Sequence, residues 1–349
     1  MKVIVDKNIS QFEKLVPLIN DLKDIDFYYL NTEEITNSSI KDAEILLVRS
    51  TLKITKDLLS NTNIKFVGSA TAGFDHINTS YLENNNINWC YSPGCNSSSV
   101  VHYVVSSIDY LSKKNLFDVN DNIGIIGYGN VGSKLSKALD NIGVKNISYD
   151  PFIDLKYLKT FDQVIKCKLI SFHVPLTVDS EFPTKNMINN TLLENSEKKI
   201  IINTSRGEIA DEIAILKNKN ITYISDVWCN EPSPSTKLIK HSFISTPHIA
   251  GYSYDGKING TINLFKELFI FLDFNENKQK TNNKIIKDFL DTKKIINYPK
   301  KISDYSSFDI SRESMNFKTL CKRYKKKIPA EVYLRARSKH PFRTDILPK

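Results

Sequence analysis

Short apolar runs separated by polar, helix-forming stretches repeat along most of this chain. In the first 92 residues the runs lie at 3–5, 45–48, 65–68 and 88–91. The pattern later resumes at 123–126, 147–149, 169–174, 199–203, 222–225 and 243–245. Short apolar runs between turn residues predict buried strands, and their alternation with helical stretches is typical of doubly wound α/β units. We therefore expect two such units, each with a parallel sheet.

A long amphipathic segment separates the two series of predicted strands. Asn96 is a candidate N-cap, because its side chain can accept a hydrogen bond from the first turn of a helix. Apolar residues then recur at helical spacing, at Val100, Val101, Val104, Val105, Ile108 and Leu111. This stripe predicts a helix with one buried face.

Three glycines follow the predicted strand at 123–126. Gly127, Gly129 and Gly132 have G-x-G-x-x-G spacing and open a helix-like segment at 133–142. The first allows a tight turn, the second lets a pyrophosphate approach the backbone, and the third lets helix pack on strand. The helix N-terminus would then hold the anion. The residues predicted to contact a dinucleotide here are Gly127, Gly129, Asn130, Val131 and Gly132.

Asp150 indicates which dinucleotide is bound. It lies 18 residues beyond Gly132, at the tip of the next apolar run. A carboxylate at that place meets the adenosine ribose hydroxyls, and its charge would repel a 2′-phosphate. The sequence therefore predicts NAD as the cofactor rather than NADP.

Composition is that of an ordinary globular protein. The 349 residues are 41% hydrophobic and 25% charged, which allows two or three domains. No apolar run has the length of a membrane span, and MKVIVD leads into a strand without a signal-peptide core, so we expect a cytoplasmic protein. The five scattered cysteines lack metal-site spacing, and we expect reduced thiols and no metal.

Three segments after the dinucleotide motif carry the candidate chemistry. INTSRGEIAD, SDVWCNEP and STPHIAGYS place Arg206, Glu231 and His248 just after three predicted strands. An arginine can grip a carboxylate with its guanidinium fork and polarise a carbonyl. A histidine can move the hydroxyl proton, and a glutamate can orient the imidazole. These residue types suit hydride transfer between a 2-hydroxy acid and a nicotinamide.

These segments resemble the signature regions of the D-isomer-specific 2-hydroxyacid dehydrogenases. Further segments, LVRST, KFVGSATAGFDHIN, SPGCNSSSVVHYV and TPHIAGYSYDGKINGT, resemble one branch of that family, whose substrate is a phosphorylated 2-hydroxy acid. The resemblance covers residues 1–272 well and the tail only loosely. It implies a catalytic trio of Arg206, Glu231 and His248, with His248 exchanging the proton.

The resemblance also implies ligand contacts. Asp150, Asp226 and Gly251 would contact NAD, and only a backbone contact is expected at Val174, where related chains carry a hydroxyl residue. Asp226 also competes with Glu231 for orienting His248. The resemblance implies that Ser50, Thr71 and Tyr252 contact the substrate. Arg49 is a candidate for the substrate phosphate, because a guanidinium suits a dianion, although a salt bridge at the strand end explains it equally well.

Charge and resemblance together suggest the domain organisation. Residues 281–349 hold 18 Lys and Arg and 7 Asp and Glu, a balance of +11, whereas the other 30 and 32 give −2. We expect a flavodoxin-like substrate-binding domain at 1–94 and 253–280. A Rossmann-type NAD-binding domain is expected at 95–252, and a small module at 281–349.

The basic C-terminal module has two predicted roles. It is too small to bury a generous core alone, and a homodimer is expected in which it packs against a partner subunit. Arg335, Arg337 or Arg343 could also attract the phosphate of the substrate. The apolar residues behind the first prediction are Ile285, Ile286, Phe289, Leu290, Ile295, Ile296, Phe317, Leu320, Tyr324, Ile328, Val332, Tyr333 and Leu334.

Two other functions stay open at this point. One is a sister dehydrogenase acting on another small 2-hydroxy acid, such as 3-phosphoglycerate. The other is a non-enzymatic NAD-binding corepressor, for which the basic tail could suit nucleic acid. The intact trio argues against a corepressor, and we expect no nucleic-acid or membrane partner.

Overall fold

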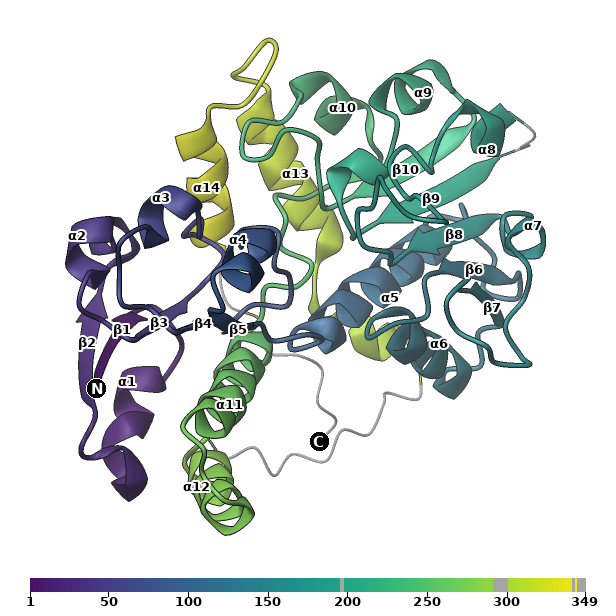
Figure 1. Ribbon diagram of the computed structural model, residues 1–349. Helices are drawn as coiled ribbons and strands as arrows, with labels where there is room; N and C mark the ends of the chain where they lie inside the picture. Colours follow the sequence, from purple (N-terminus) through teal and green to yellow (C-terminus); the bar gives the residue numbers. More distant parts are fainter. Residues whose placement is uncertain (195–197, 291–300, 341–342, 344–349) are drawn as a thin grey trace. The chain divides into compact units, whose positions relative to one another are not determined.

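The computed structural model describes residues 1–194, 198–290, 301–340 and 343 (Figure 1). The chain divides into two compact units. Unit 1 comprises Met1–Asn96 and Ser253–Ile295, and unit 2 comprises Ser97–Tyr252 and Ile296–Lys349. Each unit is built on one parallel sheet, so the predicted pair of doubly wound domains is confirmed. None of the described helices is long and apolar enough to cross a membrane.

Unit 1 holds a five-stranded sheet. Its order is β2-β1-β3-β4-β5, and every neighbouring pair is parallel. This is the flavodoxin-like order, which reverses direction between β1 and β3. The strands are β1 Lys2–Asp6, β2 Asp26–Leu30, β3 Ile45–Val48, β4 Phe66–Ser69 and β5 Asn88–Cys90.

Helices cover both faces of this sheet. One apolar cluster joins β1, β3 and β4 to the segment after β1 and to two long helices. The other joins the opposite faces of the same strands to shorter helices. The helical elements are α1 Phe12–Leu15, η1 Val16–Leu18, η2 Asn20–Leu22, η3 Thr32–Glu34, α2 Asn37–Ile40, α3 Lys56–Leu59, α4 Thr79–Asn84, α11 Tyr254–Phe271 and α12 Glu276–Phe289.

Unit 2 holds a six-stranded sheet. Its order is β11-β10-β9-β8-β6-β7, again parallel throughout. The direction reverses between β6 and β8, which is where a doubly wound sheet binds its ligand. The strands are β6 Ile123–Ile126, β7 Asn146–Tyr149, β8 Leu169–Phe172, β9 Lys199–Asn203, β10 Ile221–Ser225 and β11 Ile244–Ser245.

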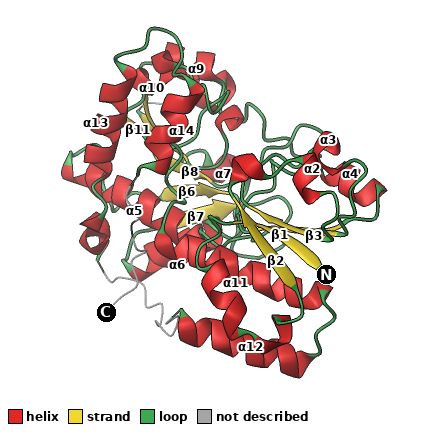
Figure 2. Ribbon diagram, turned by 90° about the vertical axis from the view of Figure 1, so that its left-hand side faces the viewer, coloured by secondary structure: helices red, strands yellow, loops and turns green. Residues whose placement is uncertain are grey.

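Two apolar clusters flank this second sheet. One contains residues of α5 and α6, and the other contains residues of α8, α9 and α10. Figure 2 shows α9 and α10 above the strands of this sheet and α5 and α6 below them. The long helix α5 begins at Ser97, next to the predicted cap Asn96. The helices are α5 Ser97–Lys113, α6 Gly132–Asn141, α7 Phe161–Val164, α8 Asn190–Glu194, η4 Gly207–Ile209, α9 Glu212–Lys217 and α10 Thr236–His241.

The C-terminal segment contributes to both clusters of unit 2. It forms η5 Ile302–Ser307, α13 Ile310–Cys321 and α14 Ala330–Ser338. Tyr305 and Phe308 join the cluster around α5, whereas Phe317 and Tyr333 join the cluster on the other face. The Ser314 hydroxyl accepts a hydrogen bond of 3.0 Å from the N–H of Ser245. The segment therefore packs along the edge strand β11, which protects the edge from other pairing.

This packing changes two expectations about the tail. The predicted boundary at residue 281 falls inside α12, which groups with unit 1, while α13 and α14 group with unit 2. Several apolar residues assigned to a partner interface are buried within their own chain: Ile286, Phe317, Ile328 and Tyr333. Their pattern thus does not by itself require a partner. Ile295 and Ile296 lie outside the described residues. The predicted substrate-binding and NAD-binding roles of the domains stay predictions.

Candidate functional site

The glycine turn of unit 2 has the geometry that the sequence predicts. Gly127 follows β6 with φ +91°, in the left-handed region that favours glycine. A Cβ at Gly127 would lie 2.4 Å from the His173 carbonyl oxygen. A Cβ at Gly132, the first residue of α6, would lie 1.9 Å from the Gly127 oxygen. These two glycines are therefore required by the packing of strand on turn and of helix on turn.

Gly129 is different and provides a test of fit for a dinucleotide. A Cβ there would meet nothing within 4 Å, and its φ is not in the left-handed region. The packing of the protein therefore does not explain why glycine stands at this position. Open space beside the backbone at the start of a ten-residue helix is what a pyrophosphate needs. The turn fits the group that the sequence predicts.

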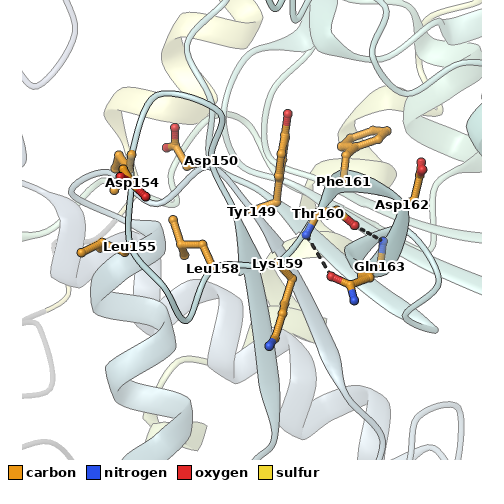
Figure 3. A pocket seen from close by; sticks show the side chains of 11 residues that line it. Tyr149, Asp150, Asp154, Leu155, Leu158, Lys159, Thr160, Phe161, Asp162 and Gln163 are labelled. Atoms are coloured by element: carbon orange, nitrogen blue, oxygen red, sulfur yellow. Dashed lines mark hydrogen bonds between the residues drawn. The ribbon is translucent and has the colours of Figure 1, made fainter.

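Asp150 is tied to the same turn. Its carboxylate accepts hydrogen bonds from the N–H of Tyr128 at 2.8 Å and from the N–H of Phe152 at 3.0 Å. It lines a hollow of about 690 Å³ with Asp154, Leu155 and Phe161, and Figure 3 shows Lys159 pointing away from Asp150. A carboxylate fixed in this way by two backbone N–H groups suits ribose hydroxyls and disfavours a 2′-phosphate.

Beside the glycine turn, β8 is shorter than predicted. It ends at Phe172, because the N–H of Val174 donates to the Ser205 hydroxyl at 3.2 Å instead of continuing the strand. That N–H is already engaged, although the sequence assigned Val174 a backbone contact with NAD. The His173 imidazole lies 2.9 Å from the Ser171 hydroxyl, and burial lowers the pKa of His173 to about 3. His173 is therefore neutral at physiological pH.

The loop carrying Arg206 is braced from two sides. The Asn203 amide donates to the Arg206 carbonyl at 2.9 Å, and the Arg206 guanidinium donates to the Ser205 carbonyl at 2.8 Å. A Cβ at Gly207 would lie 2.0 Å from the carbonyl carbon of Trp228. This close approach fixes the Arg206 loop against the loop that carries Glu231.

His248 and Glu231 form a hydrogen-bonded pair. The Nδ1 atom of His248 lies 2.7 Å from Oε2 of Glu231, and Oε1 of Glu231 accepts the N–H of Trp228 at 2.8 Å. Burial alone would raise the pKa of Glu231. The charge and hydrogen bond of His248, the Trp228 N–H and the charge of Arg337 outweigh it and hold this pKa below its usual range. Glu231 is thus an ionised partner for the imidazole.

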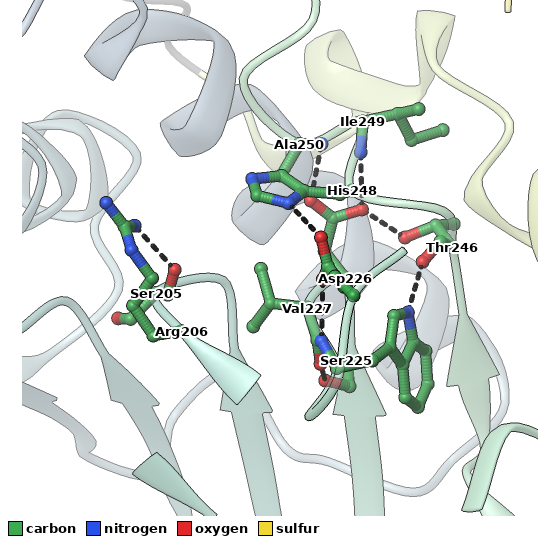
Figure 4. Close-up of polar contacts among 11 residues, drawn as sticks. Ser205, Arg206, Ser225, Asp226, Val227, Thr246, His248, Ile249 and Ala250 are labelled. Atoms are coloured by element: carbon green, nitrogen blue, oxygen red, sulfur yellow. Dashed lines mark hydrogen bonds and ion pairs between the residues drawn. The ribbon is translucent and has the colours of Figure 1, made fainter. Parts of the chain in front are cut away.

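Asp226 has another task in this structure. Its carboxylate accepts hydrogen bonds from the Thr246 hydroxyl at 2.6 Å and from the N–H groups of Ile249 and Ala250, both at 2.7 Å. Figure 4 shows these bonds beneath the His248 loop. Glu231, and not Asp226, is the carboxylate bonded to the imidazole, so the geometry favours Glu231 for orienting it. Contact of NAD with Asp226 or with the nearby Gly251 stays a prediction.

The remaining predicted substrate residues are spread over both units. In unit 1, Nε of Arg49 lies 3.2 Å from Oδ2 of Asp6, which is the salt bridge at a strand end that the sequence left open. Ser50 is exposed beside it. The Thr71 hydroxyl lies 2.8 Å from the Ser69 hydroxyl, which in turn lies 2.9 Å from Nε2 of His76.

In unit 2, the candidate substrate residue Tyr252 is half-buried, with its ring centroid 6.1 Å from that of His340. The three tail arginines differ in surroundings. Arg343 lies over the Phe308 ring and donates to the Ser99 carbonyl, whereas Arg335 is exposed. The positive charge of Arg337 is one of the causes that lower the pKa of Glu231.

Trp228 supports the pair, although the sequence did not predict it as a site residue. Trp228 binds Glu231 through its backbone and donates its indole N–H to the Thr246 carbonyl at 2.8 Å. It stands in the SDVWCNEP segment, and its position just after a predicted strand could have identified it as a site residue. Tyr333, in the tail, is buried, and the charge of Glu231 helps to raise its pKa; nothing in the local sequence predicts this proximity.

Comparisons with known proteins identify the family. Residues 112–250 match the family described as D-isomer specific 2-hydroxyacid dehydrogenase, NAD binding domain. The chain is 39% identical over 281 residues to erythronate-4-phosphate dehydrogenase of Hahella chejuensis, which covers 78% of this chain and 72% of that protein. It is 38% identical over 307 residues to the enzyme of the same name from Wigglesworthia glossinidia brevipalpis, covering 83% and 77%.

Solved structures agree on the fold. NAD-bound 3-phosphoglycerate dehydrogenase of Entamoeba histolytica aligns with a TM-score of 0.63 at 23% identity, covering 85% of this chain and 97% of that one. D-lactate dehydrogenase of Aquifex aeolicus, complexed with NAD and lactic acid, aligns with a TM-score of 0.62 at 22% identity, covering 80% and 98%.

Proposed function

The chain belongs to the D-isomer specific 2-hydroxyacid dehydrogenases, and from this membership we propose that it is an NAD-dependent dehydrogenase that oxidises 4-phospho-D-erythronate. The product is 2-oxo-3-hydroxy-4-phosphobutanoate, and the reaction serves pyridoxal phosphate formation. The relatives that match most of the chain are named erythronate-4-phosphate dehydrogenase. The PGCN and HIAGY segments are the parts of this sequence that most resemble that enzyme.

One observation supports this chemistry above all others. His248 and Glu231 are hydrogen bonded just after β10 and β11, in the sheet that carries the glycine turn. The loop of Arg206 lies against the loop of Glu231, so a proton carrier and a guanidinium belong to adjoining loops. Parallel strands bring such loops to one edge of the sheet.

The residues of unit 2 can be assigned roles in the oxidation. NAD, when bound, accepts the hydride from C2 of the hydroxy acid. His248 acts as the base that takes the C2 hydroxyl proton, and Glu231 orients the imidazole and stabilises its charge. Arg206 binds the substrate carboxylate and polarises the carbonyl as it forms.

The cofactor contacts follow from the glycine turn. The N–H groups at the start of α6 would hold the pyrophosphate, and Asp150 would accept hydrogen bonds from the ribose hydroxyls. Asn130 and Val131 belong to the same turn. Ser50, Thr71 and Tyr252 are proposed to bind the substrate. Arg49 would serve the phosphate only through the part of its guanidinium that Asp6 does not bind.

A substrate panel tests the proposed function. Purified protein is mixed with NAD and either 4-phospho-D-erythronate, 3-phosphoglycerate or D-lactate, and NADH formation is followed. We expect turnover with 4-phospho-D-erythronate and much less with the other two. Faster turnover of 3-phosphoglycerate would instead make the chain a sister dehydrogenase.

We further propose that the chain works as a cytoplasmic homodimer. Exposed apolar side chains on α13 and α14, Met315 and Leu334, support an interface. In a monomer, these apolar side chains of the positively charged tail would be exposed to solvent. Size-exclusion chromatography with light scattering should give the mass of two chains, and a single-chain mass at all concentrations would refute the dimer.

A further inference from the structure

Helix α14 of the C-terminal tail is packed against the candidate catalytic pair. Tyr333 is 1% exposed, and its ring centroid lies 6.0 Å from that of Phe317. Phe317 in turn lies 6.3 Å from Trp228, whose backbone N–H binds Glu231. An aromatic chain therefore connects the tail to the loop that holds the pair.

A second contact pins the tail to the same loop. The segment that leads into α14 forms an antiparallel bridge between Lys327 and Ser235. The N–H of Thr236 donates to the Lys326 carbonyl at 3.0 Å, and the N–H of Ile328 donates to the Pro234 carbonyl at 3.2 Å. These backbone bonds fix α14 next to the residues that follow Glu231.

The Tyr333 hydroxyl is placed to act on Glu231. It is buried, and among the described residues it has no partner at hydrogen-bond geometry. Burial first, and then the negative charges of Glu231 and Asp226, raise the pKa of Tyr333 well above its ordinary value. The phenol is therefore a permanent donor beside carboxylates, and a buried hydroxyl normally requires an acceptor.

Arg337 lies one helical turn beyond Tyr333 and is half-buried. Its charge lowers the pKa of both Tyr333 and Glu231. The exposed Arg335, two residues earlier, is not among the groups that act on Glu231. Spacing of four residues puts Tyr333 and Arg337 on the same face of the helix.

We propose that Tyr333 and Arg337 are positioning residues for the catalytic pair. The Tyr333 hydroxyl donates a hydrogen bond to the Glu231 carboxylate, and the Arg337 guanidinium places positive charge beside it. Both interactions fix the orientation of Glu231 and weaken its pull on the proton of His248. This inference rests on the proposed function, since it assigns the tail a part in the same reaction.

The other ionisable groups near Glu231 do not take over the proposed role of Tyr333 and Arg337. Asp226 has its carboxylate bound by Thr246 and two backbone N–H groups. Cys229 is neutral, because burial and the negative charges of Glu212, Glu208 and Glu231 raise its pKa to about 12. Arg206 lies on the adjoining loop, and its positive charge is the same in the wild type and in all of the variants that test the proposal. If the interaction of Tyr333 or of Arg337 with Glu231 is removed, the Glu231 carboxylate should therefore stabilise the proton on His248 more strongly.

The direct test is an NMR titration of the His248 imidazole in the free protein, in which the assignment comes from His248→Gln. Tyr333→Phe keeps the buried ring and removes only the hydroxyl, and Arg337→Gln removes the charge. Each should move the titration midpoint upward by about 0.5 pH unit or more, because hydrogen bonds and charges of this kind are worth that much. Tyr324→Phe and Arg335→Gln are the matched controls and should keep the wild-type midpoint.

Kinetics separate this inference from the proposed function. In the direction of oxidation, the acid limb of the pH–rate profile should move upward with the NMR midpoint, and Arg337→Lys should restore it. A wild-type midpoint in either Tyr333→Phe or Arg337→Gln, with melting temperature preserved, would overturn the proposal. A wild-type protein that gives no NADH from 4-phospho-D-erythronate would instead refute the proposed function, and the titration would still decide the role of the tail.

Discussion

The backbone holds His248 in place before any ligand is considered. Its φ is 56°, in the left-handed region, which costs a non-glycine residue about 1 kcal/mol. The N–H of His248 donates to the Asp226 carbonyl at 2.8 Å, and the Asp226 side chain bonds the next two N–H groups. Asp226 therefore supports the conformation that aims Nδ1 at Glu231.

Replacement of His248 by Ala should abolish oxidation and leave NADH binding nearly intact, because the imidazole moves a proton and does not anchor the dinucleotide. A general base contributes roughly 100- to 10,000-fold to the rate. Steady-state rates and fluorescence titration with NADH measure the two effects. His241→Ala, at an exposed histidine, is the control. A variant that keeps more than about a tenth of the rate would exclude His248 as the base.

Glu231→Gln should lower the rate and move the acid limb of its pH profile to lower pH. The pKa of Glu231 is held below its usual range, so the carboxylate stays charged at working pH and stabilises a proton on the imidazole. The neutral amide cannot do so, and the base form then persists to lower pH. The measurement is kcat/KM against pH. An unshifted profile would assign this task to Asp226 or to no carboxylate.

Asp150→Ser should weaken NAD binding and relax the discrimination against NADP. The carboxylate is fixed by the N–H groups of Tyr128 and Phe152, so its charge remains where a 2′-phosphate would lie. The ratio of kcat/KM for the two cofactors measures the effect. Use of NADP by the wild type at a rate similar to that with NAD would contradict this account.

At the scale of elements, the glycines of the strand-turn-helix unit formed by β6, the glycine turn and α6 have different surroundings. Gly127 and Gly132 are required by close approach within the protein, whereas Gly129 faces open space. Glycine is therefore needed at different positions of this one motif for different physical reasons.

Matched alanine variants can distinguish those reasons. Gly132→Ala should destabilise the protein by about 2 kcal/mol or more, because its Cβ would lie 1.9 Å from the Gly127 oxygen. Gly129→Ala should keep the melting temperature and lose affinity for NADH. Thermal unfolding and NADH titration of both variants give the comparison. Gly129→Ala with wild-type affinity would show that the pyrophosphate does not approach this residue.

Most strands could be predicted because buried parallel strands are continuous apolar runs. Residues 45–48, 123–126 and 199–203 were predicted with the observed bounds. The edge strand β2 was missed: Asp26–Leu30 pairs only with β1 and is partly exposed, so its sequence lacks the signature of a buried run. Edge strands need only one buried face, which makes their pattern weaker.

The residues of the candidate site could be proposed from the sequence where they follow a strand, and not where their place depends on distant packing. Arg206, Glu231 and His248 all follow strands of one sheet. The Tyr333 position depends on α14 packing on a loop about 100 residues earlier in the chain, and no local pattern records such a contact. The same reason explains why the sequence could not distinguish Arg337 from Arg335 or Arg343.

At the scale of the whole molecule, the tail is part of the core of unit 2. It supplies Tyr305, Phe308, Phe317 and Tyr333 to the two clusters that flank the second sheet. Removing it would expose apolar surface worth roughly 2 kcal/mol for each such side chain. A truncated chain would thus lose stability as well as any partner contact, so the oligomeric state is better tested on the full chain.

The central claim is that this chain is specific for a phosphorylated four-carbon 2-hydroxy acid with NAD. The most direct measurement is the ratio of kcat/KM for 4-phospho-D-erythronate to that for 3-phosphoglycerate, with NAD saturating and NADH formation as the signal. We expect a ratio of about 100 or more, which corresponds to roughly 3 kcal/mol of difference in transition-state binding. A ratio at or below one, in a folded protein that binds NADH, would contradict it.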